Sequence, residues 1–364
     1  MFFMTSNAYA MQLLTPKIGW ILTEKGLYWT TDAGSTWRNI TPPSESFGNI
    51  TAAFFLNTSQ GWVLCCNNKG EYKEFNIAYS NDSGKTWSSQ PIKLPNKDQI
   101  NQISKKLANP DRGYNQWNGT LKGTGWIDFI DPLHGWVILE IPAIARLGFT
   151  SGLFLQTTDG GKTWKSIGGC LPVAGEFYFI TSTDGWLSGY IDNHLYVTHD
   201  GGNSWKQVML QPPPQASANC WYSLPIFKDS QDGFLPVTYV SNVLILFITN
   251  DGGNTWKLNR VLPEIPDTDS AFPLTMIDSI LITLTSSDSE QSLTLIKVLP
   301  DGKIIKTTAN ALHIKGNITL HSLYFSSGWY LTFITSKQGW VTTNSNQLLS
   351  TTDGGETWTV ITPQ

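Results

Sequence analysis

Carboxylates on apolar runs are the side chains of this chain that could most directly do chemistry. Asp128 and Glu176 each lie on or beside a short apolar run that is expected to form a strand, and Glu140 lies on a third. Two carboxylates about 5–10 Å apart can hydrolyse a glycosidic bond, because one protonates the leaving oxygen while the other attacks or activates water. The spacing singles out no pair. A glycoside hydrolase site is therefore one hypothesis, and carboxylates without a catalytic role are the other.

Two turns imitate the end of a phosphate-binding loop but lack the rest of it. Gly84-Lys85-Thr86 and Gly161-Lys162-Thr163 would need a glycine five positions before their own glycine, where Tyr79 and Gln156 stand instead. Both are interpreted as hairpin turns. The five histidines and four cysteines show no metal-ligand spacing, so no metal and no cofactor is predicted.

One short motif recurs six times and accounts for many of the remaining polar residues. It reads Ser/Thr-x-Asp-x-Gly-x-Ser/Thr-Trp, and we call it the box; it occupies residues 30–37, 80–87, 157–164, 198–205, 249–256 and 351–358. Its carboxylates are Asp32, Asp82, Asp159, Asp200, Asp251 and Asp353, and its indoles are Trp37, Trp87, Trp164, Trp205, Trp256 and Trp358. The Asp can accept hydrogen bonds from N–H groups just after it, and the Gly two residues on tolerates positive φ. We therefore predict a structural turn between two strands, with the Trp packed between neighbouring sheets.

A second repeat precedes each box. It is a Gly-Trp or Gly-Phe pair, whose glycines are Gly19, Gly61, Gly135, Gly185, Gly233 and Gly339. The boxes resemble the Asp-box (BNR) repeats of sialidases and other β-propellers. The pairing of both repeats resembles the photosystem II stability and assembly factor family and its bacterial relatives, over nearly the whole chain.

The spacing of the boxes predicts the number of propeller blades. Successive box Asp residues are 50, 77, 41, 51 and 102 positions apart, and the last gap hides a blade without a box. That blade is expected at Met276–Leu284 and Leu293–Thr308, with Asp301-Gly302 in its hairpin and Ile280 in the place of the Trp. We predict a single all-β domain over residues 1–364, a seven-bladed β-propeller with the boxes between the third and fourth strands of most blades. The approximate blades are 8–42, 49–91, 124–169, 175–211, 220–262, 271–308 and 320–362.

The longest gap between complete blades contains an insertion over residues 91–123. It carries six basic residues against two acidic ones, a net charge of +4. The insertion is interpreted either as a solvated loop or as a docking element for an acidic partner.

Composition restricts the classes of function. The chain is 40% apolar and only 14% charged, with a net charge of −4, which gives no electrostatic footprint for nucleic acid. No 18-residue apolar run is present, so no transmembrane segment is predicted. Ala8-Tyr9-Ala10 imitates a signal-peptidase site, but no basic region or full apolar core precedes it. We expect an extracytoplasmic bacterial protein, secreted or envelope-associated, with its leader absent from this sequence, and a monomer.

Cys170 and Cys220 are expected to follow the fourth strands of adjacent blades. They are interpreted either as a disulfide or as two buried thiols.

The likeness to sialidases does not extend to their substrate site. Those enzymes need three arginines to grip a carboxylate with bidentate guanidinium groups. The chain has Arg38 and Arg260 on predicted outer strands, Arg112 in the insertion and Arg146 elsewhere. No such triad can be assembled from them.

Aromatic residues outside both repeats are the candidate contact residues. Exposed aromatics near the inner strands would mark a protein or sugar contact, and packing between blades is the alternative. The candidate binding residues are Trp126, Asp128, Glu176, Tyr178, Trp221, Tyr222, Trp329 and Tyr330. We expect a non-catalytic scaffold that recognises a protein partner, which could be a membrane protein. The alternative is a carbohydrate-active propeller, either a glycoside hydrolase or a lectin-like module that binds glycan. By resemblance, photosynthetic members of the family assist assembly of photosystem II.

Overall fold

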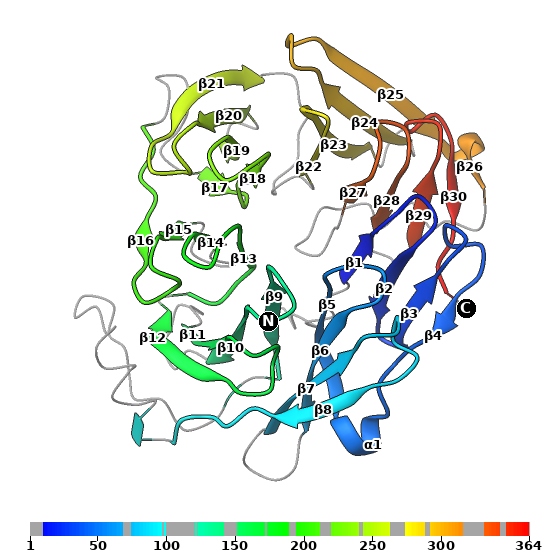
Figure 1. The fold of residues 1–364 in the computed structure, drawn as a ribbon. Helices are drawn as coiled ribbons and strands as arrows, with labels where there is room; N and C mark the ends of the chain where they lie inside the picture. The colour runs from blue at the N-terminus through cyan, green and yellow to red at the C-terminus, as the bar shows by residue number, and fades with distance from the viewer. Residues whose placement is uncertain are drawn as a thin grey trace, which may run out of the picture. The chain divides into compact units, whose positions relative to one another are not determined.

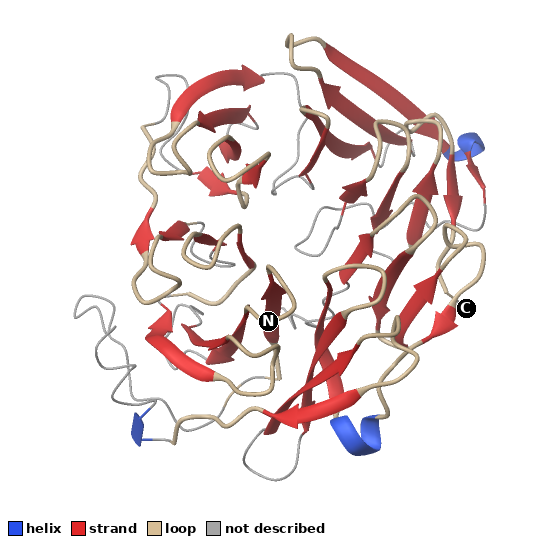
Figure 2. Cartoon of the chain, viewed as in Figure 1, coloured by secondary structure: helices blue, strands red, loops and turns tan. Residues whose placement is uncertain are grey.

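The fold is given by a computed structural model, which is almost entirely β-strand (Figures 1 and 2). It describes residues 10–67, 74–96, 98–99, 121, 123–141, 151–171, 173–188, 194–211, 220–239, 243–262, 274–287, 292–315, 331–342 and 347–363. The chain divides into two compact units. The first unit comprises residues 1–40, 212–250 and 256–364, and the second comprises residues 41–211 and 251–255. Each unit is described by itself.

The second unit holds three consecutive antiparallel sheets. Their strands are β5 (Asn49–Phe55), β6 (Gly61–Asn67), β7 (Glu74–Ser80) and β8 (Ser88–Pro91); β9 (Gly125–Phe129), β10 (Gly135–Ile141), β11 (Ser151–Thr157) and β12 (Lys165–Leu171); and β13 (Phe177–Phe179), β14 (Gly185–Ser188), β15 (Leu195–Thr198) and β16 (Lys206–Gln207). The short helix α1 (Ser44–Phe47) precedes β5.

The first unit holds the four other sheets. Their strands are β1 (Ala10–Leu13), β2 (Gly19–Thr23), β3 (Gly26–Thr30) and β4 (Arg38–Asn39); β17 (Cys220–Tyr222), β18 (Ile226–Phe227), β19 (Gly233–Tyr239), β20 (Val243–Thr249) and β21 (Lys257–Leu262); β22 (Leu274–Ile277), β23 (Ile280–Ser287), β24 (Ser292–Val298) and β25 (Ile304–Asn310); and β26 (Ile314–Lys315), β27 (Leu331–Phe333), β28 (Gly339–Thr342), β29 (Leu348–Thr351) and β30 (Trp358–Val360). The 3-10 turn η2 (Ala311–His313) joins β25 to β26.

These seven sheets are the blades of an all-β propeller, as predicted. In the first four blades and in the sixth, the strands are hydrogen-bonded in chain order. In the fifth blade β17 and β18 share the first place, and in the seventh the order is β27, β28, β29, β30 and then β26. Each box lies between the third and fourth strands of its blade, where the sequence predicted it. The blade without a box is present as β22–β25 and is the sixth.

The glycine of the Gly-Trp pair is required by a close approach. In the third blade, a Cβ added to Gly135 would lie 2.5 Å from the ring of Phe129, the last residue of β9. A Cβ added to the corresponding glycine of four other blades would lie 2.4–2.8 Å from the ring of Phe55, Phe179, Phe227 or Phe333. A side chain at this position would displace a buried ring, which explains why the repeat keeps glycine there.

The tryptophan of the pair joins one blade to the next. The Trp62 ring of the second blade stacks on Phe129 of the third, with centroids 3.8 Å apart and planes 11° apart, and its Nε1–H donates to the Gly160 carbonyl at 3.0 Å. Trp136 repeats the stacking on Phe179 at 3.8 Å and 4°. Phe129 and Phe179 are thus each packed against the glycine of their own blade and against the indole of the preceding blade.

The sixth blade makes this junction differently. Its β23 has Ile282 opposite Lys297, the place that Trp136 occupies opposite Gln156, so the prediction that Ile280 replaces the Trp was wrong by two residues. Lys297 Nζ donates to the Gly354 carbonyl of the seventh blade at 3.1 Å. This carbonyl belongs to the first box glycine, as that of Gly160 does. An ammonium group therefore replaces the indole as the donor.

The last blade packs on the first within one unit. Trp37 Nε1 donates to the Ile361 carbonyl at 2.7 Å, and its ring lies 5.7 Å from that of Trp340. Both blades draw four strands from their own segments, and β26 adds a fifth, parallel to β30. The described residues of these blades join through side chains rather than by exchange of a terminal strand.

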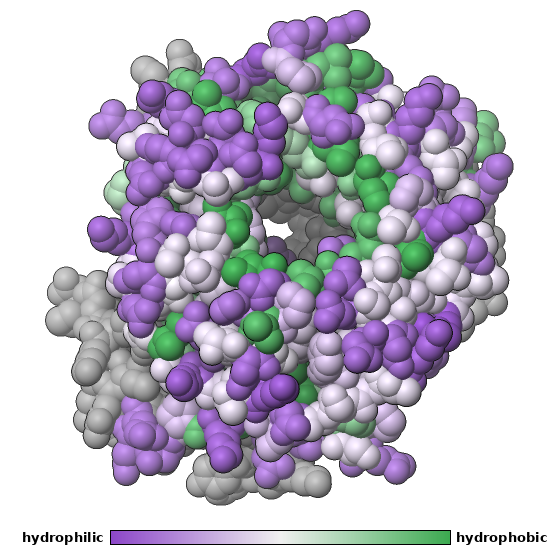
Figure 3. Space-filling view, viewed as in Figure 1, coloured by the Kyte–Doolittle hydropathy of each residue, from purple (hydrophilic) through white to green (hydrophobic). Residues whose placement is uncertain are grey.

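The visible surface is largely hydrophilic (Figure 3). Six large hydrophobic side chains of the described residues are exposed: Leu133, Met209, Leu258, Val261, Ile305 and Leu312. Among the described residues, no helix has the length and apolarity needed to cross a bilayer.

Candidate functional site

The box carboxylates are held by their own turns. Asp159 accepts hydrogen bonds from the Thr163 N–H at 2.9 Å, the Thr163 hydroxyl at 2.6 Å and the Thr157 hydroxyl at 2.8 Å. The Thr157 hydroxyl oxygen in turn accepts the Gly161 N–H at 2.9 Å. The same pair of bonds from the residue four positions on reaches Asp32, Asp82, Asp200, Asp251 and Asp353.

These bonds keep the box carboxylates ionised. The Thr86 hydroxyl and N–H lower the pKa of Asp82 to about 2. For Asp159, burial acts to raise the pKa, but the bonds from Thr163 outweigh it and the pKa is about 2. A carboxylate that accepts several hydrogen bonds in its charged form is a poor proton donor near neutrality. The box residues therefore serve as turn-forming groups, as predicted from the sequence.

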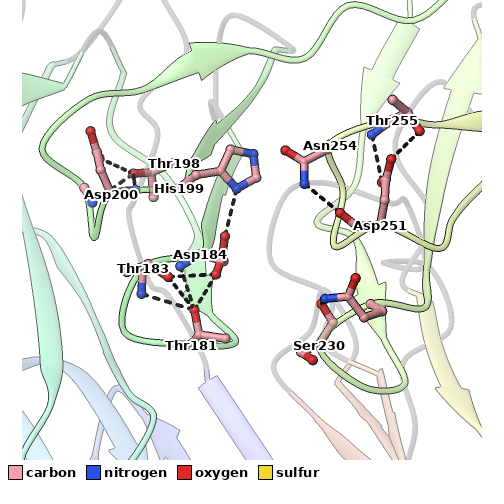
Figure 4. Close-up of polar contacts among 12 residues, drawn as sticks. Thr181, Thr183, Asp184, Thr198, His199, Asp200, Ser230, Asp251, Asn254 and Thr255 are labelled. Atoms are coloured by element: carbon pink, nitrogen blue, oxygen red, sulfur yellow. Dashed lines mark hydrogen bonds and ion pairs between the residues drawn. The ribbon is translucent and has the colours of Figure 1, made fainter.

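A cluster around Asp184 was not predicted from the sequence. Asp184 accepts hydrogen bonds from the hydroxyls of Thr181 at 2.6 Å and Thr183 at 2.8 Å, and its other oxygen lies 2.8 Å from Nδ1 of His199 (Figure 4). Burial acts to raise the pKa of Asp184, and the hydrogen bonds from Thr181 and His199 lower it overall. The carboxylate fixes the orientation of a half-buried imidazole.

A similar pair lies in the preceding blade, where His134 Nδ1 is 2.8 Å from Asp131 Oδ2. Asp131 also accepts the N–H groups of Leu133 and His134, so it closes the turn as well. Among the described residues, no group of three or more His, Cys, Asp and Glu side chains could hold a metal ion. Both pairs are thus parts of turns. Little in the sequence indicated these two contacts. His134 and Asp184 each stand directly before a Gly-Trp pair, but their partners, Asp131 and His199, are at positions that vary between the repeats.

Asp128 lies at the junction of the inner strands of the third and fourth blades. It is 9% exposed, and its Oδ2 accepts the Phe179 N–H of β13 at 2.9 Å. Burial raises the pKa of Asp128 to about 7, although the N–H groups of Phe179 and Phe129 oppose the shift. The side chain satisfies an N–H on the open edge of β13, so it is a structural link between two blades.

Tyr178 lies close to this link. Burial, and secondly the charge of Asp128, raise the pKa of the Tyr178 hydroxyl. Its ring lies 5.8 Å from that of Trp186, its partner on β14, with planes 28° apart. Tyr178 therefore packs within its own blade rather than standing free at a surface.

The two other candidates in this unit have different environments. Trp126 is half-buried on β9 and packs against the cluster that contains Phe177 and Leu187. The side chain of Glu176 is exposed, and its carbonyl accepts the Ser188 N–H at 2.9 Å. The structure thus brings Asp128 and Tyr178 together and shows Trp126 in a packing contact between blades.

Trp221 and Tyr222 are half-buried on β17 in the first unit. Cys220 precedes them and is a free cysteine, so the disulfide, one of the two interpretations of Cys170 and Cys220, is not formed. The prediction assumed equivalent places in adjacent blades, whereas β12 is the fourth strand of the third blade and β17 opens the fifth. Burial raises the pKa of the Cys220 thiol.

The remaining candidates lie outside the described residues. These are Trp329, Tyr330, Arg112 and Arg146, together with most of the insertion at 91–123. Arg38 and Arg260 lie on β4 and β21, the fourth strands of their blades, as predicted.

Known proteins provide a comparison for this arrangement. No family model matches the chain. The photosystem II assembly lipoprotein Ycf48 of Synechococcus sp. (strain CC9902) is 24% identical over 178 residues, which are 48% of this chain and 41% of the relative. The chain resembles a photosystem II assembly factor. This resemblance is the one that the paired repeats predicted.

A second relative belongs to another functional class. A xyloglucanase of Paenibacillus sp. is 26% identical over 262 residues, which are 62% of this chain and 23% of the enzyme. The matched region thus spans less than half the length of either curated relative. A solved structure described as Ycf48 bound to D1 peptide covers 86% of this chain and 82% of its own, with 17% identity and a TM-score of 0.47.

Proposed function

We propose that this chain is a non-catalytic binding scaffold that recognises a protein partner, as an assembly factor does. One observation carries the proposal. Asp128, the buried candidate for acid–base chemistry, is engaged in a hydrogen bond between two inner strands, and the six box carboxylates are held in their turns. The sequence similarity to the Synechococcus assembly lipoprotein supports the same conclusion. We further propose an extracytoplasmic location, supported by the low content of charged residues.

The aromatic residues of β17 are the contact residues that we propose within the described part of the chain. Trp221 and Tyr222 are half-buried, so each keeps part of its ring at the surface. Aromatic side chains of this kind supply much of the binding energy at protein interfaces. Asp128 and Tyr178 are assigned to stability instead.

Binding to immobilised protein tests the scaffold. The probes are a D1 peptide and an envelope extract, the latter followed by mass spectrometry of the retained proteins. We expect retention of the peptide or of one or two membrane proteins, reduced at least tenfold by Tyr222→Ala because a central aromatic contact commonly contributes over 1.4 kcal/mol. Leu133→Ser, at an exposed position in the other unit, is the control and should not change retention. Retention of neither, with the protein folded, would refute the proposal.

A glycan-active propeller is the second candidate, and it is favoured by the longer match to the xyloglucanase. Release of reducing ends from xyloglucan would establish it, and Asp128→Asn would then abolish the activity if Asp128 were catalytic. Since Asp128 accepts a backbone N–H across two blades, we expect no hydrolysis by the unmodified protein.

A further inference from the structure

A stretch of the outer edge of the first unit has an unusual charge pattern. We call residues 302–315 the sixth-blade rim; it comprises β25, η2 and β26. The rim contains Lys303, Lys306 and Lys315, all exposed, and no acidic residue. Of these lysines, Lys306 lies on β25, Lys303 in the turn before it and Lys315 on β26. The rim thus has three exposed lysines and no acidic residue.

Large apolar side chains project from the same stretch. Leu312 is 92% exposed and Ile305 is 37% exposed. Figure 3 shows green beside purple at the upper right, where Figure 1 places β24 and β25. Exposing an aliphatic side chain to water is unfavourable, and the free energy improves when another apolar surface covers it.

The turn that presents Leu312 is held by polar contacts. Asn310 Oδ1 accepts the Leu312 N–H at 3.1 Å and lies 2.7 Å from His313 Nδ1. Ile314, which follows, is buried, and β26 pairs with β30 of the seventh blade. The chain is therefore anchored on both sides of Leu312, and the leucine projects from a fixed turn.

The neighbouring strand adds another positive charge. The Arg260 guanidinium of β21 lies against the backbone of Gly302, where an added Cβ would be 2.5 Å from it. Asp301 is the one nearby carboxylate in the described turn, and its Oδ1 accepts the Lys303 N–H at 2.9 Å. The three rim lysines and Arg260 beside them thus give four cationic side chains in this region, with Asp301 as the carboxylate of the described turn.

We propose that the sixth-blade rim is a peripheral docking surface for an anionic lipid bilayer. Lysines near a negatively charged headgroup layer are attracted to it, and an aliphatic side chain between them can enter the interface. An acidic protein would satisfy the charges equally well. The bilayer is favoured because it needs no matching pocket for Leu312, which stands beyond the neighbouring side chains at 92% exposure.

Co-sedimentation with lipid vesicles tests this surface. The probes are vesicles of phosphatidylcholine alone and of phosphatidylcholine with 30% phosphatidylglycerol, about the anionic content that gives a negative surface potential. We expect binding to the anionic vesicles only, with a partition coefficient that falls as the salt concentration rises. Lys303→Gln with Lys315→Gln should lower the partition coefficient about 25-fold, since each lysine near the surface is worth about fivefold.

Leu312→Ser separates the apolar contribution from the charge. We expect about a tenfold lower partition coefficient, with the salt dependence retained, because a partly inserted leucine loses its apolar contact. Leu133→Ser is the matched control, since Leu133 is 53% exposed in the other unit, and it should bind like the unmodified protein. All four substituted positions are exposed, so unchanged thermal unfolding verifies the fold.

Three results would overturn the proposal. They are failure of the unmodified protein to bind anionic vesicles, equal binding to both vesicle types, and equal loss of binding in the Leu133→Ser control. Retention of an acidic protein by the rim without vesicle binding would also overturn it, in favour of a protein interface. None of these results bears on peptide binding through β17, so the two proposals can fail separately.

Discussion

Replacing Asp128 by Asn should remove a large part of the pH dependence of stability. Burial raises the pKa of Asp128 from 3.8 to about 7, and the folded protein therefore retains a proton that the unfolded chain loses between pH 4 and 7. Folding takes up a proton in this window. The contribution of Asp128 to the free energy of unfolding is therefore greatest below pH 4, falls as the pH rises, and is constant above about 7. At 1.36 kcal/mol for each pH unit, the cost of ionising the buried carboxyl is about 4 kcal/mol.

Asn has the same shape and can accept the Phe179 N–H with its amide oxygen. The assay is urea denaturation of both proteins at pH 4 and pH 8. The free energy of unfolding of Asp128→Asn, relative to the unmodified protein, should be higher at pH 8 than at pH 4 by up to about 4 kcal/mol.

The box residue Asp159 provides a control of opposite sign. Its pKa is lowered to about 2, so its contribution to the free energy of unfolding is present above pH 4 and is lost as the pH falls through 2. Asp159→Asn should therefore lose stability at neutral pH and show a smaller deficit at pH 2. If the difference between Asp128→Asn and the unmodified protein is the same at pH 4 and pH 8, the reasoning about its burial is refuted.

Three further substitutions test the repeat. Gly135→Ala should lower the free energy of unfolding by about 1–3 kcal/mol, measured by urea denaturation, because the new Cβ would meet the Phe129 ring at 2.5 Å. Ala33→Gly should raise the melting temperature, with a gain of about 0.5–1 kcal/mol, because Ala33 has a φ of 62°. Lys297→Met should cost about 0.5–1.5 kcal/mol by denaturation, since it removes the bond to the Gly354 carbonyl; no loss would show that this donor is dispensable.

The blade count and the box turns could be predicted because they depend on contacts close in the chain. An Asp that accepts an N–H four residues later needs no information from elsewhere, and six copies of the turn mark six blades. The place of Asp128 could not be predicted, because its acceptor role depends on an N–H of Phe179, 51 residues away. The sequence identified it only as a carboxylate on a strand, which does not show whether its role is catalytic or structural.

The same limit explains the mistaken place of Ile280 and the two interpretations left open for Cys170 and Cys220. Whether these cysteines pair depends on contacts between different blades, which their own segments do not show, and Cys220 is a free cysteine. The place of Ile280 depended on the register of β22 and β23, which are joined by a tight turn at Asp278 and Ser279 with φ of 50° and 63°. The contact residues of the scaffold are equally non-local, so only their type could be predicted.

The indole bond between blades ends on a main-chain carbonyl, and this has a consequence for how such chains can change. The acceptor is a main-chain group and so does not depend on a particular side chain; in the described residues it is the carbonyl of Gly160, Gly201 or Gly354. The donor also tolerates exchange, since Lys297 serves where Trp62 does elsewhere. A blade copied whole by gene duplication would bring with it both the donor and the acceptor that its new neighbours need. Repeats joined in this way can be gained, lost or diversified in sequence while the joint between them remains.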